Sequence, residues 1–551
     1  MSVITSRLNL VSRLFGDTRL RDKIVAYLRR CHDSQRSIQK FSLGRGDPED
    51  LLDLANTIFA TQDLVATLRE GELLSQTESS ENDCFSLMIS RIQLKGPSAL
   101  ASLIKEAIDE DGIFQRQRMD ENRAGVMFAL TQDISASQSS IDGIAAAPNG
   151  SPKKKPASIK DYYADSGEAW IIKPSASAKL NNLHKELAKL IVQKSSLEED
   201  LRGRLGASSL TLRWTPGLGH ICHVKGKDAR NLIGLRSVGS SKSTKSLHHQ
   251  DWTQLGQNID QVKFGIRAEE NIVFQYLREQ VVLNLVRLRR NARVLDELDI
   301  ACSFANLAEE QGFIRPILNT GSTHKIVGGR HPTIQSGLQQ QGRSFITNDC
   351  FVGDQERLWL ITGPNMAGKS TFLRQNALIT IMAQAGSYVP AEYAEIGIVD
   401  KIFSRVGSAD NLYNDQSTFM VEMLETATIL TQATSRSFVI MDEIGRGTTP
   451  EDGIAIAFAC LHHLYNFNQC RTLFATHFHS LADLSKDMIR VGYYYTDVAE
   501  DKDGGFTYIH RLKKGVNRKS HAFKVAMLAG VPESVIKVAK QTLNKFYLAE
   551  N

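Results

Sequence analysis

The sequence predicts a multidomain protein in which helical segments and a small β-rich segment precede an α/β domain. Three observations indicate this class. The chain has 551 residues, which is too long for a single hydrophobic core. Leucines recur at helical spacing through much of the first 300 residues. From about residue 320 to 510, apolar strand-like runs alternate with helix-like runs, as in a layered domain built on a parallel sheet.

Bulk composition is that of an ordinary globular protein. Apolar residues make up 42% and charged residues 23% of the chain, both near the average. No stretch approaches eighteen consecutive apolar residues, so we expect no membrane span. The seven cysteines are odd in number and form no C-x-x-C pair. They argue against a disulfide framework or a zinc site and favour a reducing compartment.

Residues 1–132 are predicted to form a helical core domain, with Leu51 and Leu54 among the leucines at helical spacing. The first thirty residues carry six arginines. Two interpretations stay open for them. One is a mitochondrial presequence, and the other is an ordinary amphipathic helix of this domain, which the acids Asp17 and Asp22 favour.

Residues 133–160 change abruptly to Ser, Ala, Gly, Pro and Lys and are predicted to be a flexible insert without a core. The run Lys153–Lys155 fits either a nuclear-import signal or a solvated loop.

Two long amphipathic helices are predicted, a lever helix in 161–201 and a returning helix in 266–318. Their separation suggests an antiparallel arm that carries a small domain over 202–265. Periodicity alone leaves two unrelated core helices open as the alternative.

The segment 202–265 is predicted to contain a β-hairpin around the turn Thr215–Gly219. Between Arg202 and Leu247 there are nine Lys or Arg residues and one acid. Such a surface suits the phosphate backbone of DNA, although a merely solvated surface stays open. The basic candidates are Lys225, Lys227, Arg230, Arg236, Lys242 and Lys245.

The α/β domain is predicted over 319–511, and it contains the pattern Gly363-x4-Gly368-Lys369-Ser370. An apolar strand-like run precedes this pattern and a helix-like run follows it, which is the context of the phosphate-binding loop (P-loop) of nucleotide hydrolases. Glycines let backbone N–H groups turn toward an anion, and the helix N-terminus adds its dipole. Lys369 can then reach the phosphates, and the Ser370 hydroxyl can hold Mg²⁺.

A second apolar strand, Phe438 to Met441, ends in the carboxylates Asp442 and Glu443. Asp442 suits the metal shell, and Glu443 suits a base that orients the attacking water. The C-terminal residues 512–551 read as helix, Gly530, Pro532, helix. This segment fits a helix-turn-helix, and the apolar face of its last helix favours a packing or dimer contact.

Five blocks in this order resemble the MutS family of DNA mismatch-repair ATPases. They are Gly329-Arg-His-Pro332, Ile361 to Thr371, Ser417-Thr-Phe-Met-Val-Glu-Met423, Met441 to Thr448, and Phe474-Ala-Thr-His477. The resemblance is strong from about residue 320 to 540 and continues more weakly to the N-terminus. Details such as Asp410 to Asp415 and Thr476 to His479 resemble most the fungal mitochondrial branch.

The resemblance implies an ABC-type ATPase domain that uses ATP and Mg²⁺. The resemblance implies that Ser370 and Asp442 bind the metal and that Glu443 activates water. The other implied catalytic residues are Lys369, His477 and Asn365. The implied ATP-binding residues are Gly363, Pro364, Asn365, Met366, Ala367, Gly368, Lys369, Ser370 and Thr371, with Phe345 and His510 beside adenine and Ser417 offered in trans to the partner's nucleotide.

The family also implies helical lever arms that end in a DNA clamp, with double-stranded DNA as the partner. We expect a homodimer, or a heterodimer with another MutS-type subunit, and a MutL-type partner. The fungal resemblance implies a mitochondrial location, with the nucleus as the alternative.

Three departures from the family pattern stand out. Ala367 replaces a glycine, and Tyr413-Asn-Asp-Gln416 replaces a Gly- and Ser-rich loop. The Phe-x-Glu motif that wedges beside a mispair occurs nowhere in this chain. We therefore expect the mismatch-binding and connector portions to be absent, through truncation or because mispairs are not read. The leading hypothesis is a dimeric ATPase that clamps DNA in mismatch repair; the alternatives are a recombination-type homologue on branched DNA and an ATP-gated clamp with little turnover.

Overall fold

The computed structural model describes residues 1–74, 83–119, 169–215, 217–228, 237–240, 244–364, 367–406, 418–500, 506–518 and 522–549. The chain forms two compact units. One contains Met1–Val25, Glu72–Ser86 and Glu297–Asn551, and the other contains Ala26–Gly71 and Leu87–Asp296. No helix in the described part of the chain is long and apolar enough to cross a membrane. The predicted flexible insert, 133–160, lies outside the described residues.

The N-terminal helical region is divided between these units. Helix α1 (Ser2–Gly16) buries Leu8, Val11 and Leu14 and belongs with the α/β domain. The Ser12 hydroxyl accepts hydrogen bonds from Arg315 at 2.7 Å and from the Tyr388 hydroxyl at 2.9 Å. Both interpretations of the Arg-rich start stay open, because a presequence and an ordinary first helix are both amphipathic. Further helices of this region are α2 (Thr18–Leu28), α3 (Ser34–Ser42), α4 (Pro48–Leu74), α5 (Asp83–Arg91) and α6 (Pro97–Ala107).

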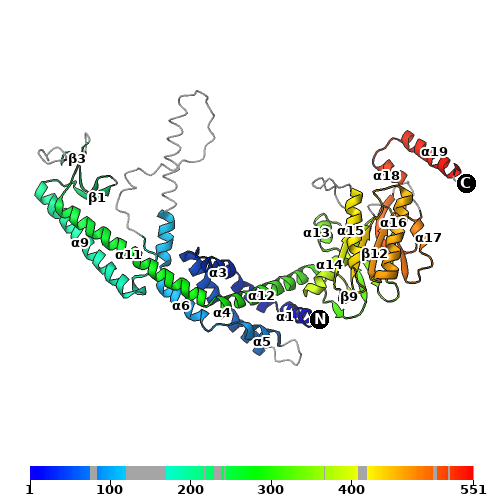
Figure 1. Ribbon diagram of the computed structural model, residues 1–551, viewed down its shortest axis with the longest axis horizontal. Helices are drawn as coiled ribbons and strands as arrows, with labels where there is room; N and C mark the ends of the chain where they lie inside the picture. The colour runs from blue at the N-terminus through cyan, green and yellow to red at the C-terminus, as the bar shows by residue number, and fades with distance from the viewer. Residues whose placement is uncertain are drawn as a thin grey trace, which may run out of the picture. The chain divides into compact units, whose positions relative to one another are not determined.

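The predicted arm is present as α9 (Ala178–Leu205) and α11 (Gln250–Leu283), which lie side by side along their length (Figure 1). Ser177 caps α9 by accepting a hydrogen bond from the Leu180 N–H, and Gly206 ends it in a left-handed conformation. The leucines predicted at heptad-like spacing on α9 belong to one core with the apolar face of α11. A short 3₁₀ turn, Pro174–Ala176, precedes α9, and α12 (Leu285–Gln311) follows α11 after a break at Asn284.

Helix α11 begins sixteen residues earlier than the predicted start of the returning helix at 266, inside the segment assigned to the small domain. Gly256 and Gly265 within this stretch, together with its polar composition, conceal the helix from sequence inspection. The structure explains Gly256, because a Cβ there would overlap the ring of His220. His220 Nε2 lies 2.9 Å from Asp260 Oδ2 one turn further along α11. The glycine therefore lets the β-rich tip pack directly on the helix.

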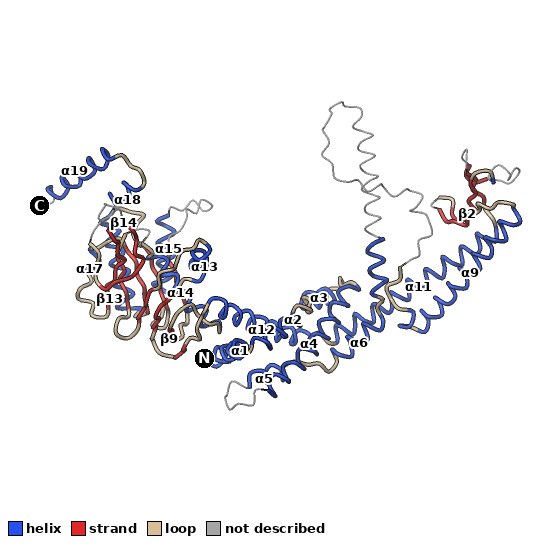
Figure 2. The backbone as a smooth tube through the Cα atoms, turned by 180° about the vertical axis from the view of Figure 1, so that it is seen from behind, coloured by secondary structure: helices blue, strands red, loops and turns tan. Residues whose placement is uncertain are grey.

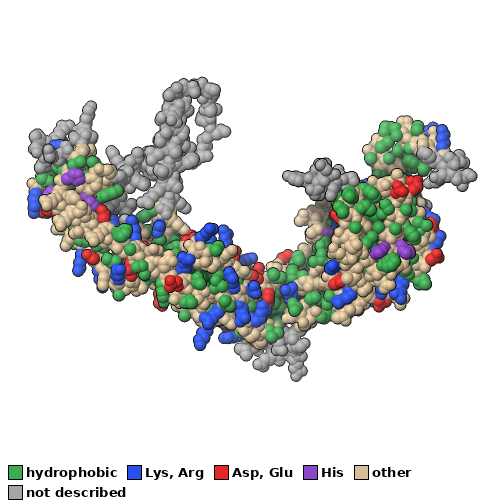
Figure 3. All heavy atoms as spheres, viewed as in Figure 1, with side chains coloured by type: hydrophobic (Ala, Val, Ile, Leu, Met, Phe, Trp, Pro, Cys, Tyr) green, Lys and Arg blue, Asp and Glu red, His purple; other side chains and the backbone are tan. Residues whose placement is uncertain are grey.

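The tip is a four-stranded antiparallel sheet of order β1-β2-β4-β3. Its strands are β1 (Thr211–Thr215), β2 (Gly219–Lys225), β3 (Ser237–Ser240) and β4 (Thr244–Leu247). The predicted hairpin is confirmed, since β1 pairs with β2 across the turn that contains Gly217. Figure 3 shows histidine side chains on this tip, where β2 carries His220 and His223.

The α/β domain is built on a six-stranded sheet of order β10-β11-β12-β8-β13-β14, in which only β14 runs antiparallel to its neighbour (Figure 2). The predicted parallel sheet is thus confirmed. The strands are β8 (Leu358–Thr362), β10 (Ile402–Arg405), β11 (Phe438–Asp442), β12 (Arg471–Thr476), β13 (Val491–Glu500) and β14 (Phe506–Lys514). A second sheet, of order β5-β9-β6-β7, consists of β5 (Ile317–Asn319), β6 (His324–Gly329), β7 (Asn348–Val352) and β9 (Tyr393–Gly397).

Helices cover both faces of the six-stranded sheet. On one face, α14 (Lys369–Ala385) packs Phe372 and Leu373 against alternate strand residues such as Ile361. On the other face, α16 (Pro450–His463) packs Cys460 and Leu461 against the remaining strand residues. Because both faces are buried, a slip of one residue in any central strand would expose apolar side chains or bury polar ones, so the register is strongly fixed.

The other helices of this unit are α13 (Pro332–Gln340), α15 (Thr418–Gln432) and α17 (Ser480–Leu484), with a π-helical turn at Leu464–Asn468. The predicted C-terminal pair of helices is confirmed as α18 (Ala522–Leu528) and α19 (Glu533–Ala549). Gly530, between them, has a φ of 82°.

Replacing Gly256 by Ala is expected to lower the free energy of unfolding by about 1–3 kcal/mol, because the added methyl group overpacks against His220. Gly265→Ala is the matched control on the same helix, since its Cβ would meet Leu183 at an ordinary 3.5 Å. The control should gain about 0.5–1 kcal/mol from reduced backbone entropy of the unfolded chain. Urea unfolding would measure both, and equal shifts in the same direction would contradict this packing of tip on helix.

Candidate active site

Three strand ends meet at one edge of the six-stranded sheet. Strand β8 runs into the loop 363–368, β11 ends at Asp442, and β12 leads to His477. Because β8, β12 and β11 are adjacent and parallel, their carboxyl ends meet at the same edge. The register pairs Asp442 with Ala475 and Thr476 with Thr362. The predicted phosphate, metal and base residues are therefore brought together from segments far apart in the sequence.

The glycine-rich loop (residues 363–368) takes a path that excludes side chains at its start. Gly363 has a φ of 142°, and a Cβ there would overlap the Thr496 hydroxyl of β13. Ala367 is fully buried. Asn365 and Met366 lie outside the described residues.

Lys369, the first residue of α14, is buried with its ammonium folded back under the loop. Its Nζ donates to the carbonyl oxygens of Gly363 at 2.7 Å and Pro364 at 3.0 Å. The same Nζ lies 3.9 Å from Glu443 Oε1. Burial lowers the pKa of Lys369, while the negative charges of Glu443 and Asp442 act in the opposite direction. The site therefore holds a desolvated cation beside two acids.

Asp442 is also buried, at the last position of β11. Burial raises the pKa of its carboxyl group, and a hydrogen bond from the Ser370 hydroxyl opposes this rise. Its Oδ1 is buried without any hydrogen-bond partner. A buried carboxylate oxygen left unpaired is costly, so this atom is suited to a cation that the structure does not contain.

Glu443 follows directly in a left-handed conformation with a φ of 52°. This conformation is unfavourable for a residue with a long side chain and is concentrated at functional sites. The backbone N–H of Glu443 donates to the Ala475 carbonyl at 2.9 Å. Its side chain, which is 17% exposed, accepts from Arg446 at 2.8 Å through Oε2. The turn thus presents a carboxylate toward Lys369 and still leaves it access to water.

His477, just past the end of β12, is largely shielded from solvent, and its Nδ1 has no hydrogen-bond partner. Burial lowers its pKa below the ordinary 6.5, and the charges of Lys369 and Arg446 lower it further, while Glu443 acts in the opposite direction. The imidazole is therefore neutral at pH 7 and can both donate and accept one hydrogen bond.

The two residues predicted beside adenine have different positions. His510 reaches the glycine-rich loop, since its Nδ1 lies 3.2 Å from the place of a Cβ on Gly368. His510 has a φ of 53°, and its carbonyl accepts from the Asn348 side chain at 2.9 Å. Phe345 is half-buried in the segment before β7, and within the described residues no ring contact joins it to His510. The pairing of the two around a base stays a prediction.

Of the predicted site residues Thr371 and Ser417, the structure describes only Thr371. Thr371 is half-buried on the first turn of α14. Ser417 lies outside the described residues, and α15 begins at the next residue, Thr418. Arg446 was not assigned a role from the sequence. Its position three residues after Glu443 was the available signal, because it places the guanidinium within reach of that carboxylate.

Two of the described basic residues of the tip, Lys225 and Lys245, point to opposite faces of its sheet. Lys225 and Lys227 are exposed at the end of β2 and in the turn after it. Lys245 on β4 is half-buried and lies opposite Val224, whose side chain is fully buried. Directly opposed residues point to the same face, so Lys245 and Lys225 point to opposite faces of the sheet. Arg230, Arg236 and Lys242 lie outside the described residues.

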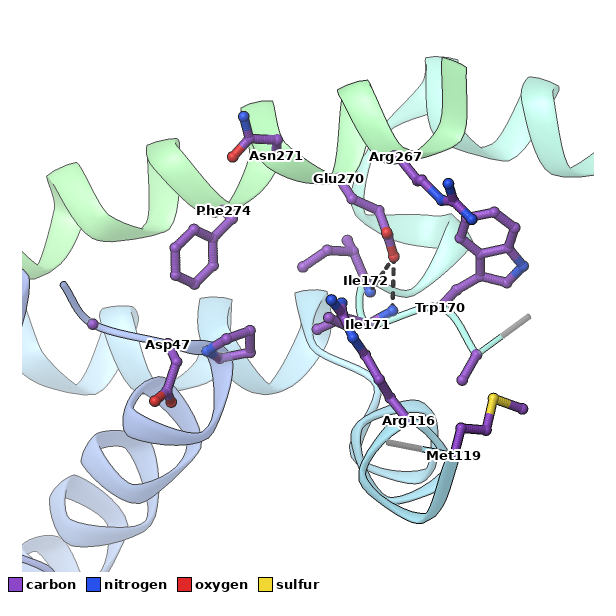
Figure 4. A pocket seen from close by; sticks show the side chains of 13 residues that line it. Asp47, Arg116, Met119, Trp170, Ile171, Ile172, Arg267, Glu270, Asn271 and Phe274 are labelled. Carbon is purple, nitrogen blue, oxygen red and sulfur yellow. Dashed lines mark hydrogen bonds between the residues drawn. The ribbon is translucent and has the colours of Figure 1, made fainter. Parts of the chain in front are cut away.

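A separate cavity of about 670 Å³ lies in the arm-bearing unit, between α11 and the segment before α9 (Figure 4). Glu270 Oε1 accepts hydrogen bonds from the backbone N–H groups of Ile171 and Ile172 at 2.7 and 2.9 Å. Burial raises the pKa of Glu270, and these hydrogen bonds, together with Arg116 and Arg267, act in the opposite direction. The Glu270 carboxylate therefore has a structural role, because it fastens the segment of Ile171 and Ile172 to α11.

The fold and the site define an α/β domain in which the central parallel strands place a glycine-rich loop, two acids and a histidine at the same edge of the sheet. Residues 1–305 match the family model described as MutS domain III, and residues 359–547 match the one described as MutS domain V. The chain therefore belongs to the MutS family.

Relatives of similar sequence are named DNA mismatch repair protein MutS. That of Rickettsia canadensis (strain McKiel) is 34% identical over 547 residues, covering 98% of this chain and 55% of its own. That of Nitrobacter winogradskyi is 34% identical over 564 residues, covering 99% of this chain and 56% of its own. That of Rickettsia massiliae is 32% identical over 545 residues, with 98% and 55% covered. The chain spans about half the length of these relatives.

The residues fit a nucleotide with a divalent cation. The unpaired Asp442 Oδ1 and the Ser370 hydroxyl supply the hard oxygen ligands that Mg²⁺ prefers. Mg²⁺ sites commonly use one or two carboxylates and leave the other positions to phosphate and water.

The raised pKa of Asp442 predicts how the stability of the nucleotide-free protein depends on pH. Between the ordinary value of 3.8 and the raised value, the folded protein keeps a proton that the unfolded chain has lost. The contribution of this group to stability therefore falls as pH rises through that window. We expect Asp442→Asn to be more stable than the parent above the window, and this advantage to shrink as pH falls through it.

Urea unfolding at a series of pH values, without nucleotide or metal, would measure this difference. Asp487→Asn is the control, because it removes an exposed acid of the same unit. Its stability relative to the parent should not show the pH-dependent advantage expected for Asp442→Asn. A variant at Asp442 that is less stable than the parent at neutral pH would contradict the burial cost assigned to this carboxylate.

Proposed function

We propose that this chain is a MutS-type ATPase that acts as a dimer and clamps duplex DNA in mismatch repair. The observation that carries the proposal is the meeting of Lys369, Asp442 and Glu443 at one sheet edge, next to the glycine-rich loop. Strand, P-loop and helix follow one another as in nucleotide hydrolases. The family match adds DNA and mismatch repair, which the names of the relatives state for those proteins.

Bound ATP with Mg²⁺ would supply the transferable γ-phosphoryl group and the divalent charge. The loop 363–368 and the N-terminus of α14 would orient the phosphates, because their N–H groups and the helix dipole favour an anion. Lys369 is already placed under this loop by the carbonyls of Gly363 and Pro364, so a phosphate would replace weak acceptors by strong ones. Ser370 and Asp442 would hold the metal.

Glu443 would accept a hydrogen bond from the attacking water and orient it. The Arg446 contact and the backbone bond to Ala475 fix the direction of its carboxylate. His477, neutral because burial lowers its pKa, would offer one ring N–H to a phosphate oxygen. Ser417 of a second subunit would complete the site in trans, so that turnover depends on the dimer. A MutL-type protein is the expected further partner.

We further propose a mitochondrial location, with the nucleus as the alternative. The support is the resemblance of Asp410 to Asp415 and Thr476 to His479 to the fungal mitochondrial branch. Fractionation of cells that express the tagged protein would test it.

Glu443→Ala is expected to lower the kcat for ATP by about 10²–10⁴-fold, the usual contribution of a positioned acid–base group, while ATP binding is retained. Lys369→Ala should instead weaken ATP binding itself, because it removes the buried positive charge that lies against the loop. Steady-state hydrolysis and equilibrium binding of a labelled ATP analogue would separate the two effects. Glu451→Ala, an exposed acid of α16, is the control. Near-normal hydrolysis in both site variants would remove the catalytic assignment.

Charge reversal at Lys225 and Lys227 is expected to weaken duplex binding and to reduce its dependence on salt. Each phosphate contact that is lost should reduce the slope of log K against log salt by about 0.9. The control is the same reversal at Lys185 and Lys189, which are exposed on α9 away from the strands. Titration of perfect and mismatched duplexes at several salt concentrations would measure both slope and preference. An unchanged slope in the first variant would show that these lysines do not contact DNA.

A further inference from the structure

A buried ion pair lies behind the turn that carries Glu443. Arg405, the last residue of β10, and Glu422, on α15, are each 5% exposed, and Arg405 Nη2 lies 3.2 Å from Glu422 Oε2. Burying two charges costs more than an isolated pair usually returns, so such a pair needs a further reason. Neither residue belongs to the loop or to the acids described above.

The second oxygen of Glu422 provides that reason. Glu422 Oε1 accepts a hydrogen bond of 2.5 Å from the backbone N–H of Gly445, in a fully buried position. Gly445 is two residues beyond Glu443, and Ile444 between them is fully buried. Glu422 therefore holds Arg405 with one oxygen and the Glu443 turn with the other.

The turn requires this support. Glu443 has the left-handed φ of 52°, which a residue with a side chain keeps only where its surroundings enforce it. On one side the turn is held by β12, through the bond from the Glu443 N–H to the Ala475 carbonyl at 2.9 Å. On the other side, the Glu422–Gly445 bond holds it to α15. Loss of the Glu422–Gly445 bond leaves the backbone of the turn with only the first of these two bonds.

We propose that Glu422, oriented by Arg405, is a positioning residue that couples helix α15 to the Glu443 carboxylate. This inference rests on the proposed function, because it assigns a role toward the water-orienting acid. Helix α15 begins at Thr418, next to the serine that the family resemblance offers to the partner's nucleotide. Glu422 follows one turn later, so a displacement of the first turn of α15 reaches the Glu443 turn through one hydrogen bond. Contact with a second copy of this chain thereby adjusts hydrolysis in the subunit that makes the contact.

Two double variants separate positioning from stability. Arg405→Met/Glu422→Gln removes both charges and keeps an oxygen for the Gly445 N–H. Arg405→Met/Glu422→Met also removes both charges but leaves no acceptor. Replacing a buried ion pair by apolar groups of similar volume is often neutral for stability, so both variants should fold. Thermal unfolding of the full chain is the check on folding.

We expect the Gln variant to retain most of the parent's kcat and the Met variant to lose about 10- to 100-fold, as a shift of about 1 Å in a catalytic group can cause. The KM for ATP should change by less than about threefold in both variants, because the interaction acts on turnover and not on ground-state binding. Glu425→Ala is the control. Glu425 pairs with the same Arg405 at 3.2 Å, but it is 45% exposed and makes no described contact with the turn.

Amide hydrogen exchange of the Gly445 N–H gives a readout that does not need turnover. Exchange of this N–H should be faster in the Met variant than in the Gln variant, while exchange within β11 stays unchanged. Equal kcat and equal exchange in the two variants would overturn the inference, and so would a loss in Glu425→Ala as large as in the Met variant. If the parent chain hydrolyses no ATP with or without DNA, the proposed function fails, and the exchange comparison still decides whether α15 holds the turn.

Discussion

The parallel pairing of β8, β12 and β11 is the constraint on which the rest of the site depends. Each strand contributes one functional position at its carboxyl end, and these positions coincide only in the observed register. Because side chains alternate between faces, a slip of one residue would turn Asp442 from its side of the sheet to the other. Burial of both faces by α14 and α16 prevents such slips, so packing far from the edge fixes the geometry of the edge. The same strands that make the core thus place the chemistry.

Buried ionisable side chains in this domain fall into two groups, which their positions distinguish. Arg471 is fully buried and its guanidinium donates to backbone carbonyls, including those of Gly397 at 2.7 Å and Arg436 at 2.8 Å. His324 is buried with a pKa lowered to about 4, shares one hydrogen bond with Asn376, and stacks on Phe438. These groups serve the core. Asp442 and His477 lie at the edge of the sheet, and each has a buried polar atom without a partner, as Arg471 Nε and His324 Nδ1 also have in the core. Such a deficit costs stability, and at the sheet edge a ligand that removes it is bound more strongly for that reason.

The sequence predicted the strands of the α/β domain well because their apolar runs are short, continuous and bounded by glycine or acids. The strand that begins at Phe438 ends at Asp442, as predicted. The sequence could not predict that α1 packs against α14, since an amphipathic face does not specify its partner. The early start of α11 was missed because a glycine at position 256 weakens the helical pattern. The reason for this glycine is its contact with His220, 36 positions earlier in the chain, which composition does not reveal. Glu422 was visible within a family block, but its link to Gly445 depends on a backbone N–H that no side-chain pattern encodes.

The proposed DNA contact and the proposed ATP hydrolysis require different precision in the placement of side chains. This difference explains why the sequence indicates their residues to different degrees. Attraction of phosphates by lysines is non-directional and extends over a Debye length of about 8–10 Å, so exposed cations with little support are sufficient. The charge count over the tip is therefore a sufficient basis for proposing DNA contact there, although the register shows that Lys225 and Lys245 point to opposite faces. Phosphoryl transfer, in contrast, depends on placement within fractions of an ångström. The residues assigned to it are accordingly buried and held from two sides, as Lys369 is by two carbonyls and the Glu443 turn by β12 and α15. Positions held in this way are determined by strand register and backbone hydrogen bonds, and only a structure shows them.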